Sequence, residues 1–113
     1  MTYYRRNKYN SRKTIYNGIK YDSKLEAEYA QQLDIRKRDG DIKDWRRQEP
    51  IKLEVNGKKI ATYKVDFVIT HNDNAEEYIE IKGMRTAVFN LKWKLFEALY
   101  PDIKKTILTR NDI

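Results

Sequence analysis

The stretch 50–70, "PIKLEVNGKKIATYKVDFVIT", decides the fold because it predicts a long β-hairpin. The Asn-Gly pair at 56–57 is the strongest short signal for a two-residue turn with positive φ angles. Apolar and β-branched residues on both sides of this turn predict one strand over 51–55 and a second over 59–70. A polar turn, "HNDNAEE", then leads into a third predicted strand over 77–82.

The segment before this hairpin predicts a helix. Ser23 is a good N-cap, and Gly40 suits the end of the pattern in "SKLEAEYAQQLDIRKRDG". Glu26 falls inside the apolar arc of this helix, whereas Glu28 points to solvent. A carboxylate at the buried edge of a helix needs a partner. A second Asn-Gly pair, at 17–18, predicts a small hairpin ahead of the helix.

The segment after the third strand predicts a second helix over 86–101, which Pro101 ends. Its apolar residues recur at helical spacing: Val88, Leu91, Leu95 and Leu99, with Phe89, Trp93 and Phe96 broadening the face. "KKTILT" at 104–109 predicts a last strand, parallel to the third because a β–α–β crossover joins them. The order of helix, three antiparallel strands, helix and strand indicates an α/β fold with a mixed sheet flanked by helices.

Charge is distributed unevenly along the 113 residues, whose net charge is +7. Residues 1–21 hold six Lys or Arg and no Asp or Glu, whereas the remainder holds 18 basic and 17 acidic side chains. Tyrosines interleave with these basic residues, a composition that suits contact with nucleic acid, and a solvated N-terminus is the alternative. We therefore expect a basic arm over 1–14, followed by one domain over 15–113.

Other features of the composition limit the possible functions. The chain has no cysteine, which excludes disulfides, zinc knuckles and thiol catalysis. No apolar run has the length of a membrane span and the N-terminus lacks an apolar signal region, so we expect a cytoplasmic protein without membrane contact. The single histidine excludes nuclease chemistry of the HNH type.

The second and third predicted strands each carry a carboxylate among apolar residues. Asp66 lies mid-strand, and Glu80 and Lys82 share one face of the third strand. If these strands are neighbours and the first helix packs over that face, Glu26 joins both acids. Three converging carboxylates repel one another, so a divalent cation such as Mg²⁺ would be needed to neutralise them. Strict alternation places the apolar residues of the second strand on its other face: Tyr63, Val65, Phe67 and Ile69.

Asp66, followed after thirteen residues by Glu80-Ile81-Lys82, resembles the signature of the PD-(D/E)XK nuclease superfamily. The predicted order of helix, three strands, helix and strand is the core of that superfamily. "YDSKLEAEYAQQL" and "EIKGMRTAVFNLKWKLFEALYP" are similar to a group of small phage proteins described as Holliday junction resolvases. The resemblance covers roughly residues 15–109, although valine stands before Asp66 where the superfamily has proline.

The resemblance implies a role for each residue that matches the motif. Asp66 and Glu80 would ligate Mg²⁺, for which Mn²⁺ is expected to substitute, with the Ile81 carbonyl as a further ligand. Lys82 would be the catalytic lysine, and Glu26 the helix-borne acid that completes the metal site. Structural alternatives exist: a capping box for Glu26 and the N-cap serine, an ion pair for Glu80 and Lys82, and a strand end for Asp66.

Further basic and polar residues are candidates for contact with DNA. Gln48, at the mouth of the first strand, could touch phosphate, and an ordinary loop residue is the alternative. Lys92 on the second helix resembles a basic position near the site in the phage group, and a solvated helix face is the alternative. The basic arm contributes Arg5, Arg6, Lys8, Arg12 and Lys13.

The acidic cluster and the resemblance together predict a Mg²⁺-dependent DNA endonuclease that hydrolyses phosphodiester bonds. The resemblance implies a phage origin and branched DNA as the substrate, as for a Holliday junction resolvase. Paired cuts across a junction need two sites, so we expect a two-fold homodimer. A nuclease of the same superfamily acting on duplex, flap or nicked DNA is one alternative. A non-catalytic DNA-binding module with this fold and a structural protein of a phage particle are the others.

Overall fold

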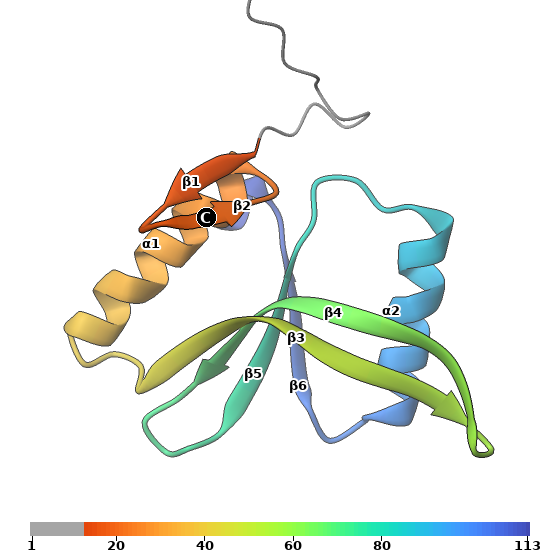
Figure 1. Cartoon of the computed structure of the whole chain (residues 1–113). Coiled ribbons are helices and arrows are strands. Elements are labelled where there is room, and N and C mark those ends of the chain that lie inside the picture. The colour runs from red at the N-terminus through yellow and green to blue at the C-terminus, as the bar shows by residue number, and fades with distance from the viewer. Residues whose placement is uncertain (1–12) are drawn as a thin grey trace, which may run out of the picture.

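The computed structural model describes residues 13–113 as an α/β fold (Figure 1). Its main sheet consists of β3 (Asp44–Val55), β4 (Lys58–Thr70), β5 (Glu76–Ile81) and β6 (Lys104–Leu108). The other elements are the strands β1 (Thr14–Tyr16) and β2 (Ile19–Tyr21), the helices α1 (Lys24–Arg38) and α2 (Ala87–Leu99), and the short 3₁₀-helix η1 (Arg110–Asp112). No helix within residues 13–113 is long and apolar enough to span a membrane.

The main sheet is mixed, with the strand order β3-β4-β5-β6. The strands β3, β4 and β5 pair antiparallel, and β6 runs parallel to β5. The strands β1 and β2 form a separate two-stranded sheet beside α1. The predicted fold class and the predicted order of helix, three antiparallel strands, helix and strand are therefore confirmed.

Both Asn-Gly pairs form the turns that the sequence predicts. Asn56 and Gly57, between β3 and β4, have φ angles of 51° and 79°. Asn17 and Gly18, between β1 and β2, have φ angles of 52° and 77°. Asparagine and glycine adopt this left-handed conformation more readily than other residues, so these pairs fix where each hairpin turns.

The strand β3 is longer than the sequence predicts. It begins at Asp44 and not at residue 51, so the charged segment ahead of residue 51 also pairs with β4. Arg46 in this segment forms ion pairs with Glu49 and Glu76, with N–O distances of 3.0 and 2.6 Å. The first half of β3 lacks alternating apolar residues. Its backbone pairing with β4 and the ion pairs of Arg46 stabilise it as a strand.

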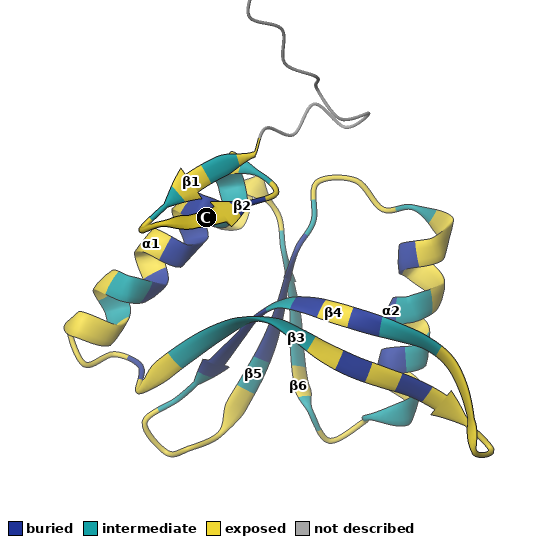
Figure 2. Ribbon diagram, viewed as in Figure 1, coloured by how far each residue is buried: buried dark blue, intermediate teal, exposed yellow. Residues whose placement is uncertain are grey.

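The two helices cover opposite faces of the sheet (Figures 1 and 2). The core on the α1 side contains Ala27, Tyr29, Ala30, Leu33, Phe67, Ile69, Ile79 and Ile81. The core on the α2 side contains Val65, Val68, Tyr78, Phe89, Trp93 and Phe96. Glu80 alternates with Ile79 and Ile81, so it faces the α2 side. The expectation that the first helix packs over the face of Glu80 is therefore wrong.

The strand β4 contributes to both cores because its side chains change faces near Asp66. Val65 packs in the core on the α2 side, whereas Phe67, two residues later, packs in the core on the α1 side. Strict alternation would put both on one face, so this expectation is also wrong. Gln48, opposite Asp66 in the register, has a φ angle of 56°, and the ladder between β3 and β4 has no pair at this position.

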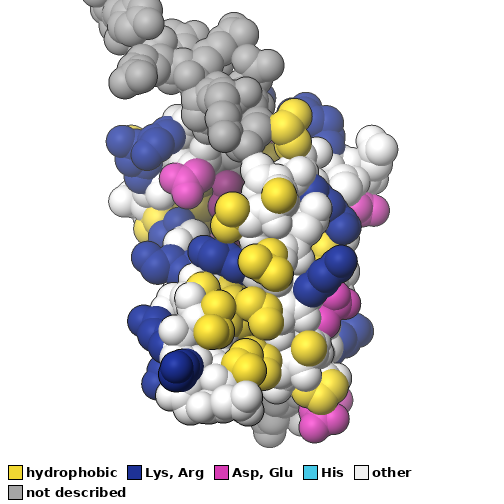
Figure 3. Space-filling model, turned by 90° about the vertical axis from the view of Figure 1, so that its right-hand side faces the viewer, with side chains coloured by type: hydrophobic (Ala, Val, Ile, Leu, Met, Phe, Trp, Pro, Cys, Tyr) yellow, Lys and Arg dark blue, Asp and Glu magenta, His cyan; other side chains and the backbone are white. Residues whose placement is uncertain are grey.

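The helix α2 is apolar on its outer face as well as its inner one. The sequence predicts Val88 and Leu91 in its apolar stripe, yet their side chains are 63% and 60% exposed. The buried stripe consists of the aromatic residues Phe89, Trp93 and Phe96. Aromatic side chains bury more apolar area than Val or Leu, which favours this orientation. Figure 3 shows apolar side chains gathered over α2, with basic side chains on both sides.

Replacement of a residue on each face of α2 tests this orientation. Phe96 is fully buried, with its ring centroid 5.6 Å from that of Tyr63, so Phe96→Ala should cost about 3–5 kcal/mol of unfolding free energy. Lys94→Ala, the control at an exposed position of α2, should change this free energy by no more than about 0.5 kcal/mol. Urea unfolding measures both values, and equal losses would contradict the assignment of the two faces.

Candidate active site where two strands separate

The strands β4 and β5 separate at the position of two carboxylates. Their antiparallel ladder ends at the pair of Phe67 and Ile79. The next pair in this register is Asp66 and Glu80, at which no ladder pair forms. The Asp66 carboxylate instead accepts a hydrogen bond from the backbone N–H of Ile81, with an N–O distance of 2.8 Å. The structure thus brings together the two acids that the sequence predicts on neighbouring strands.

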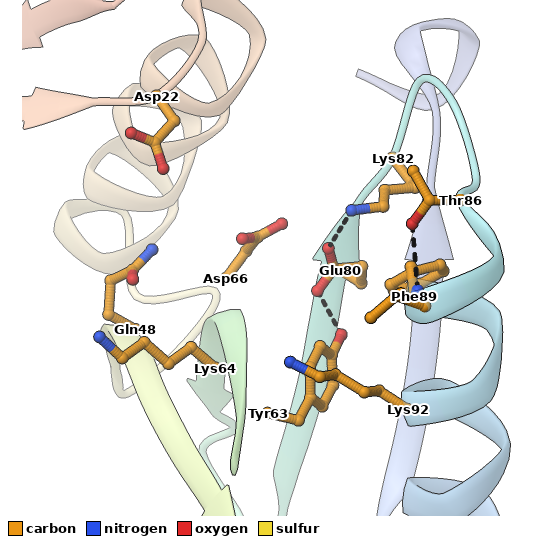
Figure 4. A pocket seen from close by; sticks show the side chains of 11 residues that line it. Asp22, Gln48, Tyr63, Lys64, Asp66, Glu80, Lys82, Thr86, Phe89 and Lys92 are labelled. Atoms are coloured by element: carbon orange, nitrogen blue, oxygen red, sulfur yellow. Dashed lines mark hydrogen bonds and ion pairs between the residues drawn. The ribbon is translucent and has the colours of Figure 1, made fainter. Parts of the chain in front are cut away.

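Glu80 is the more deeply buried acid of this pair, with 3% of its surface exposed. The Tyr63 hydroxyl donates a hydrogen bond to Glu80 Oε1, and Lys82 Nζ lies 3.4 Å from Glu80 Oε2 (Figure 4). Lys82 Nζ also lies 4.3 Å from the centroid of the Phe89 ring. Glu80 and Lys82 therefore form the same-face pair that strand alternation predicts, and a phenol holds the second carboxylate oxygen.

The carboxyl groups of this site bind protons more tightly than free ones. Burial, followed by the charges of Glu80 and Glu26, raises the pKa of Asp66 to about 9. Burial also raises the pKa of Glu80, although the Tyr63 hydroxyl and the charge of Lys82 act in the opposite direction. At neutral pH the pair therefore holds a proton, which a bound cation could replace.

An open pocket of about 350 Å³ lies beside the two carboxylates. One wall carries Asp22 from the segment before α1, Gln48 from β3 and Lys64 from β4 (Figure 4). The other wall carries residues of β5, of α2 and of the segment between them, and Asp66 lies between the two walls. The residues of this second wall are Glu80, Lys82, Thr86, Phe89 and Lys92, and Tyr63 and Val88 also line the pocket.

Glu26 lies near the two acids but does not line the pocket. Its carboxylate accepts a hydrogen bond from the Ser23 hydroxyl, with an O–O distance of 3.0 Å, and Ser23 Oγ caps the Glu26 N–H at 3.1 Å. Burial raises the pKa of Glu26, and the charges of Asp22 and Glu80 act in the same direction. The capping contact and the electrostatic contact with the acids coexist. Glu28 is exposed, as the helical pattern predicts.

The donor atoms of this site suit a hard divalent cation. Asp66 and Glu80 offer carboxylate oxygens, and the open pocket leaves room for water and phosphate, with which Mg²⁺ completes its ligand shell. Within residues 13–113, no group of three or more Asp, Glu or His side chains is placed to hold a metal ion by itself. The ligand roles of Glu26 and of the Ile81 carbonyl stay predictions.

The residues predicted to contact DNA fall into two groups. Gln48 and Lys92 line the pocket from opposite walls, and Lys92 Nζ lies 3.4 Å from the carbonyl oxygen of Thr62, to which it donates. Lys13 is exposed, and its ammonium lies 4.0 Å from Asp22 at the edge of the pocket. The remaining residues of the predicted arm lie outside the described residues: Arg5, Arg6, Lys8 and Arg12.

Sequence reasoning did not assign six residues of this pocket to the site: Asp22, Tyr63, Lys64, Thr86, Val88 and Phe89. Tyr63 has the alternation of a core residue, and its contact with Glu80 depends on the change of faces in β4. Asp22 stands just ahead of the N-cap of α1, and Lys64 has the pattern of a solvent-facing strand residue. Neither carries a local signal that distinguishes it from an ordinary surface residue.

The raised pKa of Asp66 predicts a pH-dependent stability for the metal-free protein. The folded protein retains a proton that the unfolded chain, with a carboxyl pKa near 3.8, releases. Unfolding is therefore increasingly favoured as the pH rises from about 4 to about 9, by at most about 1.4 kcal/mol per pH unit for one proton. Thermal unfolding in EDTA should show a melting temperature that falls over this range, and Asp66→Asn should flatten the fall.

Glu28→Gln is the control for this measurement, because its exposed carboxylate lies on the same helix as Glu26 but away from the site. The control should keep the wild-type dependence on pH. A variant Asp66→Asn with an unchanged dependence would show that Asp66 does not hold the proton.

Comparison with known proteins places the chain in a family. A search of curated proteins gives no match. The model of a family described as "Protein of unknown function (DUF1064)" matches residues 6–112. This match spans every helix and strand of the fold, and the chain therefore belongs to the DUF1064 family.

Proposed function

We propose that this protein is a Mg²⁺-dependent DNA endonuclease of the PD-(D/E)XK type, which hydrolyses phosphodiester bonds. The observation that carries the proposal is the meeting of Asp66 and Glu80 beside an open pocket, with the Lys82 ammonium 3.4 Å from Glu80. Packing alone does not require two carboxylates here, because burial disfavours their charged forms. Acids with raised pKa values beside a pocket favour a catalytic role.

Asp66 and Glu80 would hold the cation in this proposal. When bound, Mg²⁺ would neutralise the pair, polarise a phosphoryl oxygen and lower the pKa of a coordinated water. The chain itself fixes both ligands, because the Ile81 N–H binds Asp66 while Tyr63 and Lys82 bind Glu80. Ligands that are held in place before the substrate arrives need little reorganisation during the reaction.

Basic and polar side chains around the pocket would bind the DNA backbone. Lys82 lies nearest to the acids and would stabilise the charge that develops on the reacting phosphate or orient the attacking water. Lys64 and Gln48 on one wall, and Lys92 on the other, would contact neighbouring phosphates. The excess of basic residues in the N-terminal arm supports DNA as the partner.

Branched DNA, such as a Holliday junction, is the substrate that we propose. This substrate is supported by the resemblance of the segments around α1 and α2 to phage proteins described as junction resolvases. A phage origin would place the protein in the cytoplasm of a host cell. Two cuts across a junction need two sites, so we propose a homodimer. The apolar outer face of α2, with Val88 and Leu91 exposed, supports self-association because it offers a surface for a second copy.

Asp66→Asn and Glu80→Gln should each abolish cleavage while leaving DNA binding intact or tighter. Each change removes a ligand charge from the cation and also removes repulsion between the site and phosphate. The assay uses fluorescently labelled junction, duplex and single-stranded DNA, with Mg²⁺ and with EDTA, and fluorescence anisotropy measures binding. Wild-type cleavage by either variant would refute the site.

The same assay separates the proposed function from its alternatives. Cleavage of duplex, flap or nicked DNA in preference to the junction would keep the nuclease and change its substrate. Binding to DNA without cleavage in Mg²⁺ or Mn²⁺ would favour a non-catalytic module.

Glu26→Gln tests whether the helix-borne acid takes part in the reaction. If the Glu26 carboxylate only holds the Ser23 hydroxyl that caps α1, Gln can accept the same hydrogen bond from that hydroxyl, and activity should stay near wild type. If Glu26 contributes negative charge to the cation site, activity should fall at least about tenfold, or about 1.4 kcal/mol, and recover partly at high Mg²⁺. We expect the second result, because its charge acts on both Asp66 and Glu80.

Glu28→Gln, the matched control on the exposed side of α1, should keep full activity. Equal activity in the two variants would remove Glu26 from the site and leave the cation to Asp66 and Glu80.

A further inference from the structure

Tyr63 is fixed by the core on the α2 side. It lies in β4, three residues before Asp66, and 6% of its surface is exposed. Its ring centroid lies 6.2 Å from those of Phe89 and Trp93 and 5.6 Å from that of Phe96. Two of these three contacts are edge-on, a favourable geometry for aromatic pairs. The position of the Tyr63 hydroxyl is therefore set by the packing of α2 on the sheet.

The Tyr63 hydroxyl and the Lys82 ammonium each contact one oxygen of the Glu80 carboxylate. Tyr63 donates to Oε1, and Lys82 lies 3.4 Å from Oε2 (Figure 4). Tyr63 is buried and tied to the core, whereas the Lys82 side chain is 27% exposed and borders the pocket. Tyr63 is therefore the partner of Glu80 whose position the core sets, whereas Lys82 is the more exposed partner.

We propose that Tyr63 is a positioning residue that orients the Glu80 carboxylate so that Oε2 stays available to a divalent cation. The inference rests on the proposed function, because it takes Glu80 as a ligand. A phenol suits the role since it donates a hydrogen bond without adding a charge that would repel the cation. Partners that hold metal ligands in this way commonly change metal affinity by 10- to 100-fold when they are removed.

Tyr63→Phe tests the proposal, because it keeps the ring and its aromatic contacts and removes the donor. Titration calorimetry of the full chain with Mn²⁺ should show an affinity at least about tenfold weaker than that of the wild type. The matched control is Tyr78→Phe. Tyr78 is also buried in the core on the α2 side, with its ring centroid 5.9 Å from that of Phe96, but it lies outside the pocket. Tyr78→Phe should keep the wild-type affinity.

A double-mutant cycle distinguishes positioning from a general effect on packing. If Tyr63 acts through Glu80, Tyr63→Phe should weaken Mn²⁺ binding no further once Glu80→Gln is present. Additive losses, an equal loss in Tyr78→Phe, or wild-type affinity in Tyr63→Phe would each overturn the inference and leave the proposed function standing. A wild-type chain that binds no Mn²⁺ would overturn the proposed function itself, and the positioning role with it.

Discussion

The carboxyl groups of Asp66 and Glu80 lie where β4 separates from β5. The site depends on how the backbone groups at this point find hydrogen-bond partners after the ladder ends. Strands that part lose ladder hydrogen bonds, and a buried N–H without an acceptor costs about 1–3 kcal/mol. Asp66 supplies the acceptor, since the Ile81 N–H donates to its carboxylate at 2.8 Å. The same side chain therefore satisfies the backbone and carries the charge. Asparagine could accept this hydrogen bond, which separates the structural role of Asp66 from its electrostatic one.

The separation also divides the hydrophobic core. The strand β4 gives Val65 to the core on the α2 side and Phe67 to the core on the α1 side. Asp66, which lies between these two residues in the strand, lines the pocket (Figure 4). One wall of the pocket belongs with α1 and β3, and the other with β5 and α2. The distance between Gln48 and Lys92 on these walls therefore depends on how each helix packs. A core substitution in either helix could alter the site without touching it.

Local signals were sufficient to predict most elements. Turns at Asn-Gly pairs, the N-cap at Ser23 and the alternation of β5 each depend on a few neighbouring residues, and the structure confirms them. The meeting of Asp66 and Glu80 was also predictable, because the order of antiparallel strands limits which residues can lie together. The sheet face that α1 covers was not predictable. The side chains of β4 change faces opposite Gln48, whose backbone is left-handed, and the hydrophobic periodicity of the sequence does not indicate this change. Tyr63 was missed for the same reason.

The acids of the site oppose folding when no cation is bound. Burial raises the pKa values of Asp66, Glu80 and Glu26, which means that each carboxylate bears a cost of desolvation. Lys82 offsets part of this cost at Glu80, and the charge of Arg47 offsets part of it at Glu26. In the described part of the chain, Asp66 forms no ion pair and lies between the two walls. A proton or a cation therefore relieves the greatest electrostatic cost at Asp66, and this couples the stability of the fold to whatever the site binds.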